Sequence, residues 1–360
     1  MKSQHPVGYL YDPLFLSHTL PGHPENHERL EAVMRRLREY GELEHLIELT
    51  FAPADETQLC AVHVDAYVEL VKQVSARGRA MLGPDTYIHP ATFRAASAAA
   101  GAAMAAVRAV LGGQVDRAFA LVRPPGHHAF PDHGEGFCLF NNIACAAQYA
   151  LGEVPGEGRP ARPLERVMIV DWDVHHGNGT QAMFYEDPRV LFVSIHQFPL
   201  YPMSGHVNEL GAGPGRGYTV NVPLPPRIGD AGYARVLEEI VVPLARRFRP
   251  ELMLMSAGYD GHWIDPLAGM ALSLTGFGRI VATLSQLSED LCAGRLVGVL
   301  EGGYDHDVLS YGVLNTFRLL RGESVASLLD PIGPFAGREA SVEPIIRQVR
   351  AAHALSSSQT

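Results

Sequence analysis

The sequence predicts an α/β fold in which helices cover both faces of a central parallel sheet. Six short apolar runs have the continuous hydrophobicity of strands buried on both faces, and helical patterns alternate with them. Polar motifs follow most of these runs directly, which is where ligands bind in open parallel sheets. The expected strands are 117–122, 166–170, 190–195, 218–222, 251–256 and 295–300.

The composition is that of a globular chain. Of the 360 residues, 47% are hydrophobic, which is ample for a large core, and α/β folds of this length occur as one unit. We expect a single domain over 1–360, with its core at about 5–325 and a helical tail at 326–360. The net charge of −10 and the lack of a dense Lys/Arg block argue against nucleic acid as a partner and mildly favour a positively charged one.

Compartment is indicated by the cysteines and the N-terminal segment. The four cysteines form no CxxC pair, as is usual in a reducing cytosol. The N-terminal segment has no signal-peptide core, and the alanine-rich stretch 95–107 is too short to span a bilayer, so we expect it to be a buried helix. We therefore expect a cytoplasmic protein with no membrane partner, and a homo-oligomer is compatible with the sequence.

Helical patterns fall between and beside the expected strands. The first pattern is 27–41, and Gly41 is expected to cap its C-terminal end. The later patterns are 233–248, 277–291 and, in the tail, 342–355.

Two Gly/Pro/Arg-rich stretches, 152–164 and 211–217, interrupt this rhythm and are expected to be surface loops. The second precedes a strand and lacks the spacing of a dinucleotide-binding fingerprint, so it does not indicate a Rossmann site. The polar SSSQT end at 356–360 is expected to be frayed.

Histidine, aspartate and tyrosine gather after the expected strands. RPPGHH follows 117–122, DWDVHHGNGT follows 166–170, SIH closes 190–195, AGYD follows 251–256, and EGGY follows 295–300. Because the carboxyl ends of parallel strands meet at one edge of a sheet, these motifs predict a single site at that edge.

DWDVHHGNGT contains two residues that could hold a metal ion. Asp173 and His175 are two positions apart, so on an extended segment their side chains point the same way. A carboxylate and an imidazole suit a borderline ion such as Zn²⁺, and Asp260 is the best-placed third ligand. A lone DxH pair would more often be a loop cap or an ion pair. The nearby His127 and His128 favour the metal site.

Absent motifs narrow the chemistry further. The sequence contains no helical HExxH, no GxSxG elbow and no P-loop. It therefore lacks the motifs typical of zincin proteases, serine hydrolases and nucleotide-hydrolysing enzymes. A metal with histidine bases, and with Tyr304 behind Gly302 and Gly303 as an oxyanion donor, is suited to amide hydrolysis.

These motifs together resemble the zinc-dependent histone deacetylase family, most closely its class II branch and the bacterial histone deacetylase-like amidohydrolases. The resemblance runs from about residue 23 to about residue 325 and implies a single-domain arginase/deacetylase-type fold with its site at the C-terminal strand ends. It also implies hydrolysis of an acetyl-lysine amide by metal-activated water, with release of acetate. The motifs that carry it are RPPGHHA, GFCLFNN, DWDVHHGNGT, SAGYDGHWIDPLAG and LEGGY.

The resemblance implies a role for each matching residue. Asp173, His175 and Asp260 would hold the catalytic Zn²⁺. His128 would be the general base, with His127 as its electrostatic partner. The Tyr304 hydroxyl would polarise the scissile carbonyl. Gly136, Phe137 and Tyr201 would form the tunnel that grips the acyl-lysine stem.

Supporting residues follow in the same way. Asp171 would bond His127 and favour its cationic form, whereas Asn178, an amide where some relatives have Asp, would leave His128 neutral. Gly302 would contact the substrate, and Asp85 would lie at the tunnel rim and accept substrate N–H groups. Leu267 stands where polyamine-selective relatives place an acidic residue.

The resemblance also implies bound K⁺, held largely through backbone carbonyls. One ion would lie near Asp171, Asp173, His175 and Ser194, and another near Phe184, Asp187 and Val190.

Several neighbouring residues are expected to be structural. His176 and His196 should be hydrogen-bonding residues outside the ligand set, and Cys138 a buried, inert thiol. Arg29 could line an internal channel for acetate or could form a helix-surface salt bridge; the sequence leaves both open.

Four functions fit the sequence to different degrees. Deacetylation of acetyl-lysine in a protein or peptide leads, and deacetylation of acetylpolyamines or other small acetylated amines is the first alternative. A dimanganese ureohydrolase of the arginase type would need further bridging carboxylates, which DWDVHHGNGT and Asp260-Gly261-His262 do not supply. A non-catalytic acetyl-lysine binder would typically have lost Tyr304 or a metal ligand.

Overall fold

The computed structural model describes residues 5–155 and 161–355, and its centre is an eight-stranded parallel sheet. Each neighbouring pair of strands in this sheet is parallel, and the order across it is β2-β1-β5-β10-β9-β6-β7-β8. The strands are β1 (Val7–Leu10), β2 (Ile47–Glu48), β5 (Arg117–Ala120), β6 (Val167–Asp171), β7 (Val190–Gln197), β8 (Thr219–Leu224), β9 (Leu252–Ala257) and β10 (Leu296–Leu300).

All six strands expected from the apolar runs are present, within a few residues of their expected ends. Every residue of β5 through β10 in the large sheet is buried, which explains why these strands have no alternating pattern. Two strands at one side of the sheet, β1 and β2, were not predicted. β2 has only two residues, both of them exposed, and a segment this short carries no measurable periodicity.

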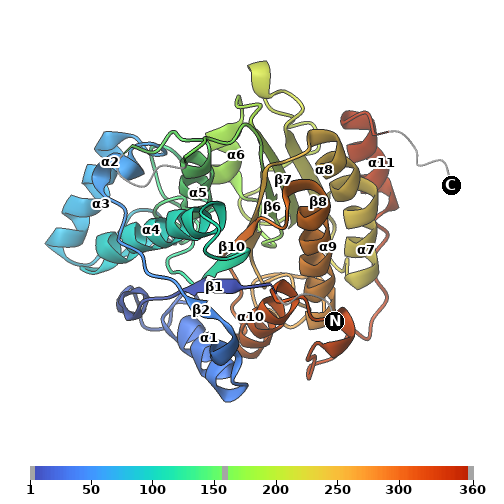
Figure 1. Ribbon diagram of the computed structural model, residues 1–360, viewed down its shortest axis with the longest axis horizontal. Coiled ribbons are helices and arrows are strands. Elements are labelled where there is room, and N and C mark those ends of the chain that lie inside the picture. Colours follow the sequence, from blue (N-terminus) through green and yellow to red (C-terminus); the bar gives the residue numbers. More distant parts are fainter. Residues whose placement is uncertain (1–4, 156–160, 356–360) are drawn as a thin grey trace.

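Helices cover both faces of the sheet (Figure 1). On one face, α4 contacts β5 and packs against α5, and α6 comes next along the chain. On the other face, α9 contacts β9 and β10 and packs against α10. Helix α10 in turn packs against α1. The helices are α1 (Glu28–Glu39), α2 (Glu56–Leu59), α3 (Asp65–Arg77), α4 (Thr92–Leu111), α5 (Asn142–Ala150), α6 (Asn178–Phe184), α7 (Asp230–Val236), α8 (Val242–Phe248), α9 (Leu274–Cys292), α10 (His306–Leu320) and α11 (Glu343–Ala352).

The alanine-rich helix α4 is longer than the expected stretch 95–107. It runs for 20 residues, so by length and composition it could cross a bilayer, but 83% of its most apolar window is buried inside the protein. Its small side chains allow close packing: a Cβ at Gly101 would lie 2.1 Å from the Ala52 carbonyl oxygen. The helix therefore belongs to the core, as expected.

The predicted helix 233–248 is continuous but irregular. Helices α7 and α8 are joined by a π-helical turn at Leu237–Val241. Pro243 stands in the first turn of α8, where a proline has no N–H to donate to the preceding turn, and the wider π turn accommodates this. The first helix ends as expected, with Gly41 in the left-handed conformation just after its C-cap.

The remaining expectations concern loops and the tail. Residues 211–217 form a loop with one short 3₁₀ turn, and the tail helix is α11, which contacts β8. Part of the stretch 152–164 and the whole SSSQT end lie outside the described residues. A small antiparallel pair, β3 (Ala80–Met81) and β4 (Tyr87–Ile88), lies apart from the main sheet.

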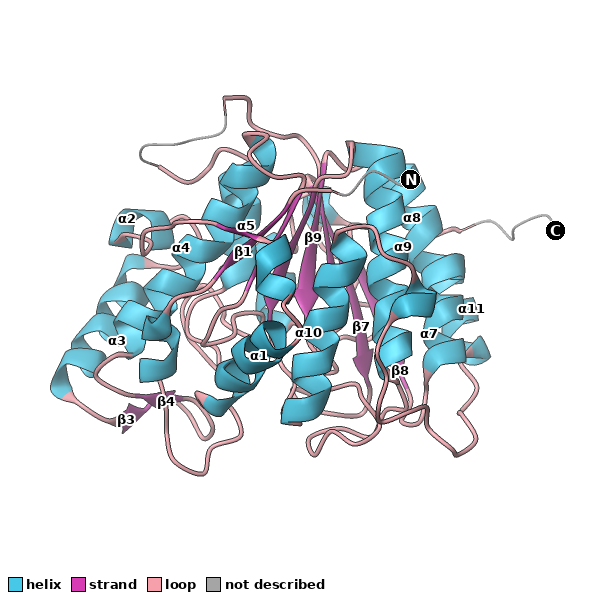
Figure 2. Ribbon diagram, turned by 60° about the horizontal axis from the view of Figure 1, so that its bottom comes forward, coloured by secondary structure: helices cyan, strands magenta, loops and turns pink. Residues whose placement is uncertain are grey.

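Figure 2 shows the strands running towards one edge of the sheet, where long loops gather. The four strands that precede the densest polar motifs, β5, β10, β9 and β6, occupy four adjacent central positions. The segments after these strands are thereby brought together at one edge.

Candidate active site

Three predicted metal ligands converge after β6 and β9. Asp173, His175 and Asp260 each offer a ligand atom, and these atoms lie within 4.8 Å of one another. His175 Nδ1 is 3.1 Å from Asp173 Oδ1 and 3.2 Å from Asp260 Oδ2. All three side chains are almost completely buried.

Backbone N–H groups hold the two carboxylates in place. The Gly302 N–H donates to Asp173 Oδ2 at 2.8 Å, and the Val174 N–H donates to Asp260 Oδ1 at 2.9 Å. A Cβ at Gly302 would lie 2.3 Å from Asp260 Oδ2 and 2.6 Å from Asp173 Oδ2. Position 302 therefore requires glycine. The first glycine of EGGY is needed because a side chain there would collide with the two carboxylates, and not because the loop must be flexible.

The cluster has the donor chemistry and charge of a divalent-metal site. Burial alone would lower the pKa of His175, but hydrogen bonds to Asp173 and Asp260 and the charges of these carboxylates raise it to about 10. Two buried carboxylates therefore stabilise positive charge at this point. One imidazole and two carboxylates form a three-ligand set that suits Zn²⁺ and leaves a fourth position for water or substrate.

The tandem histidines after β5 lie beside this cluster, with ring centroids 3.9 Å apart. His127 Nδ1 is 3.0 Å from Asp171 Oδ2, and its Nε2 is 3.7 Å from Asp173 Oδ1. Burial alone would lower the pKa of His127, but the charges of Asp173 and Asp171 raise it to about 10. His127 is therefore cationic at neutral pH.

His128 has the opposite electrostatic environment. Its Nδ1 is 2.8 Å from Asn178 Oδ1, and its ring centroid is 6.1 Å from that of His175. Burial lowers the pKa of His128 well below its usual range, and positive charge on His127 and His175 lowers it further. His128 is therefore a neutral imidazole.

Two predicted tunnel residues contact the rings of Tyr304 and His128. The Phe137 ring meets Tyr304 edge-on at 6.0 Å between centroids, and the Tyr201 ring meets His128 edge-on at 5.3 Å. Gly136 is left-handed, with φ of 54°, and a Cβ there would lie 2.4 Å from His128 Cδ2. The small residue at 136 therefore makes room for the His128 ring.

Tyr304 follows β10 and is held by a residue that sequence reasoning missed. Buried Asp265 accepts the backbone N–H of Tyr304 at 2.8 Å and that of Asp305 at 3.3 Å. Burial and then the charge of Asp260 raise the pKa of Asp265 to about 7. Burial and nearby Asp260 also raise the pKa of the Tyr304 hydroxyl well above its usual range, so it remains a proton donor.

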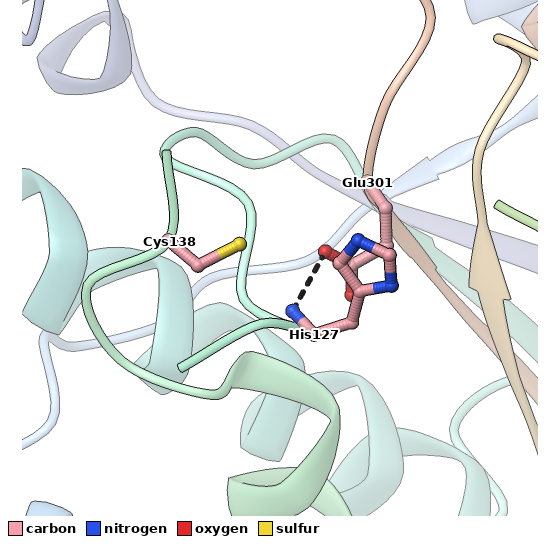
Figure 3. A group of neighbouring side chains, drawn as sticks. All are labelled: His127, Cys138 and Glu301. Atoms are coloured by element: carbon pink, nitrogen blue, oxygen red, sulfur yellow. Dashed lines mark hydrogen bonds between the residues drawn. The ribbon is translucent and has the colours of Figure 1, made fainter. Parts of the chain in front are cut away.

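Glu301 is a second missed residue, although it lies in the LEGGY motif at the end of β10. Its carboxylate accepts the backbone N–H of Gly126 at 2.7 Å. It also accepts that of His127 at 3.2 Å, the bond drawn in Figure 3. Burial raises the pKa of Glu301 to about 7. A charged residue directly after a buried apolar strand was the available signal.

His127, Cys138 and Glu301 form a further group of neighbouring metal-ligand types (Figure 3). Each already has another partner: the His127 ring binds Asp171, Glu301 binds backbone N–H groups, and the Cys138 thiol donates to the Gly136 carbonyl at 3.4 Å. Burial raises the pKa of Cys138 well above its usual range, so it is an inert thiol. The group therefore has a structural role: Glu301 holds the backbone at Gly126 and His127.

Arg29 lies behind Tyr304 in the interior, so a helix-surface salt bridge is wrong for it. Its guanidinium donates to the carbonyls of Gly303 at 2.7 Å and Glu301 at 2.6 Å and pairs with buried Glu25 at 3.2 Å. It also lies 5.1 Å from the Tyr304 ring centroid.

Asp85 and Leu267, two residues predicted to contact the substrate, lie near Tyr201 and Tyr304. Asp85 is partly buried, and its negative charge adds to the effect of burial in raising the pKa of Tyr201. Leu267 is partly buried and donates its N–H to Asp265 Oδ1 at 3.0 Å, which places it one contact from Tyr304.

The residues expected around K⁺ fall into two places. Asp171 and Ser194 are partners in the β6–β7 register, beside Asp173 and His175. Phe184, Asp187 and Val190 share one turn, in which Asp187 N–H donates to the Phe184 carbonyl and Val190 N–H to that of Asp187.

His176 and His196 are buried outside the ligand cluster, as predicted. His176 bonds Ser204 at 2.8 Å and Gln181 at 3.1 Å, and His196 bonds Ser194 at 2.9 Å and the Gly205 carbonyl at 3.0 Å.

The fold and the site together define a class of protein: an α/β amidohydrolase with a metal-ligand cluster, paired histidines and a tyrosine at one sheet edge. The model of the histone deacetylase domain matches residues 23–320. A probable deacetylase of Archaeoglobus fulgidus is 41% identical over 329 residues, covering 90% of this chain and 89% of that protein. The chain belongs to the histone deacetylase family, and the expected arginase/deacetylase fold is confirmed.

Other relatives include deacetylases with different names. A histone deacetylase-like amidohydrolase of Pseudomonas aeruginosa is 39% identical, covering 87% of this chain and 80% of that protein. The human polyamine deacetylase HDAC10 is 38% identical, covering 86% of this chain and 46% of that protein. The crystal structure of the HDA15 HD domain aligns with a TM-score of 0.86 at 32% identity, covering 97% of this chain and 94% of that one.

Proposed function

We propose that this chain is a zinc-dependent hydrolase that removes acetyl groups from acetylated lysine and releases acetate. Family membership supports a deacetylase; the metal, the substrate and the residue roles are the proposal. One observation carries it: a neutral His128 lies beside the Asp173, His175 and Asp260 cluster, and Tyr304 is close enough for the Asp260 charge to add to the effect of burial in raising its pKa. A base, an oxyanion donor and a metal site are the three parts that amide hydrolysis requires.

Asp173, His175 and Asp260 would hold the Zn²⁺, since their donor atoms converge and are oriented by backbone N–H groups. When bound, the ion would polarise the acyl carbonyl and acidify a water molecule.

The protein's own groups then have distinct tasks. His128 accepts the proton of the attacking water at Nε2, because its Nδ1 faces the Asn178 carbonyl oxygen and carries the ring proton. The Tyr304 hydroxyl donates a hydrogen bond to the acyl oxygen as it becomes negative. As the C–N bond breaks, the proton on His128 passes to the amine nitrogen. Cationic His127, held by Asp171, stabilises the negative charge nearby.

Acetyl-lysine is the preferred substrate because of the aromatic residues at the site. Phe137 and Tyr201 contact Tyr304 and His128, so an extended apolar stem would pass between aromatic side chains on its way to the cluster. Gly136 leaves room for the His128 ring and Gly302 for the carboxylates of the cluster, and Asp85 is a candidate acceptor for substrate N–H groups.

Small acetylated amines are the second candidate, favoured by the similarity to a human polyamine deacetylase. Leu267 argues against selectivity for them, because an uncharged side chain gives no attraction to a distant ammonium. We also propose that K⁺ binds near Asp171 and Ser194 and in the turn at 184–190, where it would stabilise the fold.

The test is an activity panel on zinc-loaded protein. An acetyl-lysine peptide should release acetate with kcat/KM at least tenfold above that of acetylspermidine, and His128→Ala should nearly abolish turnover. Tyr311→Phe is a matched tyrosine control, because that hydroxyl contacts only Tyr40 among the hydrogen bonds described. Unaltered turnover in His128→Ala, or no acetate from either substrate, would refute the proposal.

A further inference from the structure

Asn178, the partner of His128, is itself held by a second residue. Its Nδ2 group donates to Glu135 Oε1 at 2.5 Å, while its Oδ1 lies 2.8 Å from His128 Nδ1. Glu135 comes from the loop that precedes Gly136 and Phe137, whereas Asn178 begins α6. Three segments of the chain thus form a line of side chains that ends at the histidine ring.

The direction of these hydrogen bonds is fixed by chemistry. A carboxylate only accepts hydrogen bonds, so Glu135 must face the NH₂ end of the Asn178 amide. The amide oxygen then faces His128, and Gly179 N–H donates to the same oxygen at 3.1 Å. Since an amide oxygen also only accepts, His128 must carry its proton on Nδ1 and present an unprotonated Nε2.

The Glu135 side chain is placed to maintain this arrangement. It is 30% exposed, so the bond to Asn178 is partly shielded from water. It also borders an open cleft of about 620 Å³ with Tyr201, whose hydroxyl interacts with the carboxylate. Glu135 therefore joins the residue that orients the base to a wall of the expected tunnel.

We propose that Glu135 is a positioning residue for the reaction: by binding the Asn178 amide, it fixes the tautomer of His128 that can accept a proton. This inference rests on the proposed function, because it assumes that His128 is the base. Glu135 itself does not touch the reacting atoms. Holding a histidine base in the wrong tautomer can lower kcat by up to ~10⁴-fold. Residues that select the correct tautomer can therefore have a large effect on kcat.

The inference predicts different results for three single variants. Glu135→Ala leaves the NH₂ end of Asn178 without its acceptor, so kcat should fall about tenfold with KM changed less than about twofold. Glu135→Gln can still accept through its amide oxygen, so kcat should stay within about threefold of the parent. Asn178→Asp opposes two carboxylates at hydrogen-bond distance, so kcat should fall at least tenfold.

The double variant Glu135→Gln with Asn178→Asp is the critical one. The new amide at position 135 can donate through its NH₂ group to the new carboxylate at position 178. That carboxylate can still accept from His128 Nδ1, so kcat should recover to within about threefold of the parent. Asp307→Asn is the control, because it removes an exposed carboxylate on α10 that pairs with Arg36 rather than with Asn178 or Glu135.

A second readout does not depend on turnover. Nitrogen-15 NMR of histidine-labelled protein distinguishes Nδ1–H from Nε2–H, and the His128 signals are assigned by their loss in His128→Gln. The parent should show Nδ1–H at His128, and Glu135→Ala should show a mixture.

Three results would overturn the inference: full kcat in Glu135→Ala, no recovery in the double variant, or an effect on KM alone for positively charged substrates. The last would mean that Glu135 binds a cation in the cleft. Lack of deacetylase activity in the parent, with Nδ1–H still dependent on Glu135, would instead refute the proposed function and leave the orienting role intact.

Discussion

Asp265 Oδ2 accepts the backbone N–H of Tyr304 at 2.8 Å, joining the loop after β9 to the loop after β10. The same oxygen accepts the Asp305 N–H, and the other oxygen accepts that of Leu267 at 3.0 Å. A single buried carboxylate thus fixes the backbone from which the tyrosine hydroxyl is presented. The position of that hydroxyl depends on Asp265 as well as on the glycines before Tyr304.

Replacing Asp265 should reduce catalysis through Tyr304. Asp265→Ala leaves three backbone N–H groups without their acceptor, so kcat should fall at least tenfold and stability by about 1–3 kcal/mol. In a Tyr304→Phe background the same replacement should have little further effect on kcat, which steady-state kinetics of the double variant would measure. If Asp265→Ala lowered kcat by the same factor in the parent and in Tyr304→Phe, a role of Asp265 through Tyr304 would be contradicted. Asp307→Asn, an exposed carboxylate on α10, is the control.

Removing the Tyr304 hydroxyl should affect kcat far more than stability. Tyr304→Phe keeps the ring contact with Phe137 but loses the donor to the developing oxyanion, so kcat should fall about 10²–10³-fold. Thermal unfolding should remain within about 2 °C of the parent if the ring packing is retained. Kinetics with an acetyl-lysine peptide, compared with Tyr311→Phe, would test this; a loss under threefold would contradict it.

Chelation should remove both activity and stability. A metal that binds only the folded state at about 1,000 times its Kd contributes about 4 kcal/mol, so the chelated protein should unfold at a lower temperature. Zinc addition should restore both properties. In Asp260→Asn, chelator should leave the unfolding temperature unchanged, because one ligand is already missing. Full activity in protein shown by elemental analysis to lack metal would contradict this prediction.

Mild acid should destabilise the protein through buried neutral histidines such as His63. His63 Nδ1 contacts the Phe130 carbonyl and its Nε2 accepts the Asn141 N–H, and burial lowers its pKa to about 4. Between pH 6.5 and 4 the unfolded chain therefore binds a proton that the folded chain does not. Stability from this group is present above pH 6.5 and is lost as pH falls, by up to about 1.4 kcal/mol per pH unit.

Urea unfolding at pH 7 and pH 5 would measure this effect. The difference in unfolding free energy between the two pH values should be about 1–2 kcal/mol smaller in His63→Gln than in the parent. Exposed His45→Gln should retain the parental difference. An unchanged difference in His63→Gln would show that His63 does not contribute to acid unfolding.

The central strands and the convergence of Asp173, His175 and Asp260 could be predicted because their signals are local. Continuous apolar runs mark β5 through β10 of the large sheet, and each motif begins where its run ends. Asp173 and His175 share one motif, and Asp260 follows β9, which is the neighbour of β6 in the sheet. Because β6 and β9 are adjacent in the sheet, the residues that follow them lie close together.

The supporting residues could not be predicted, because their partners come from other segments. Glu301 binds N–H groups after β5 because β10 is the neighbour of β5, and no local pattern encodes that strand order. Asp265 precedes a proline and reads as an ordinary loop residue until its contact with Tyr304 is seen. Glu135 likewise becomes informative only beside Asn178.

The backbone N–H groups that bind Asp173 and Asp260 influence how the protein loses function. Gly302 and Val174 lie shortly beyond the ends of central strands, and their N–H groups are occupied by Asp173 and Asp260. Displacing either carboxylate therefore breaks a hydrogen bond between the segments that follow two different strands. Hydrogen exchange at these two amides should be as slow as in the middle of the sheet, and activity and tertiary structure should disappear together on denaturation, without an inactive folded intermediate.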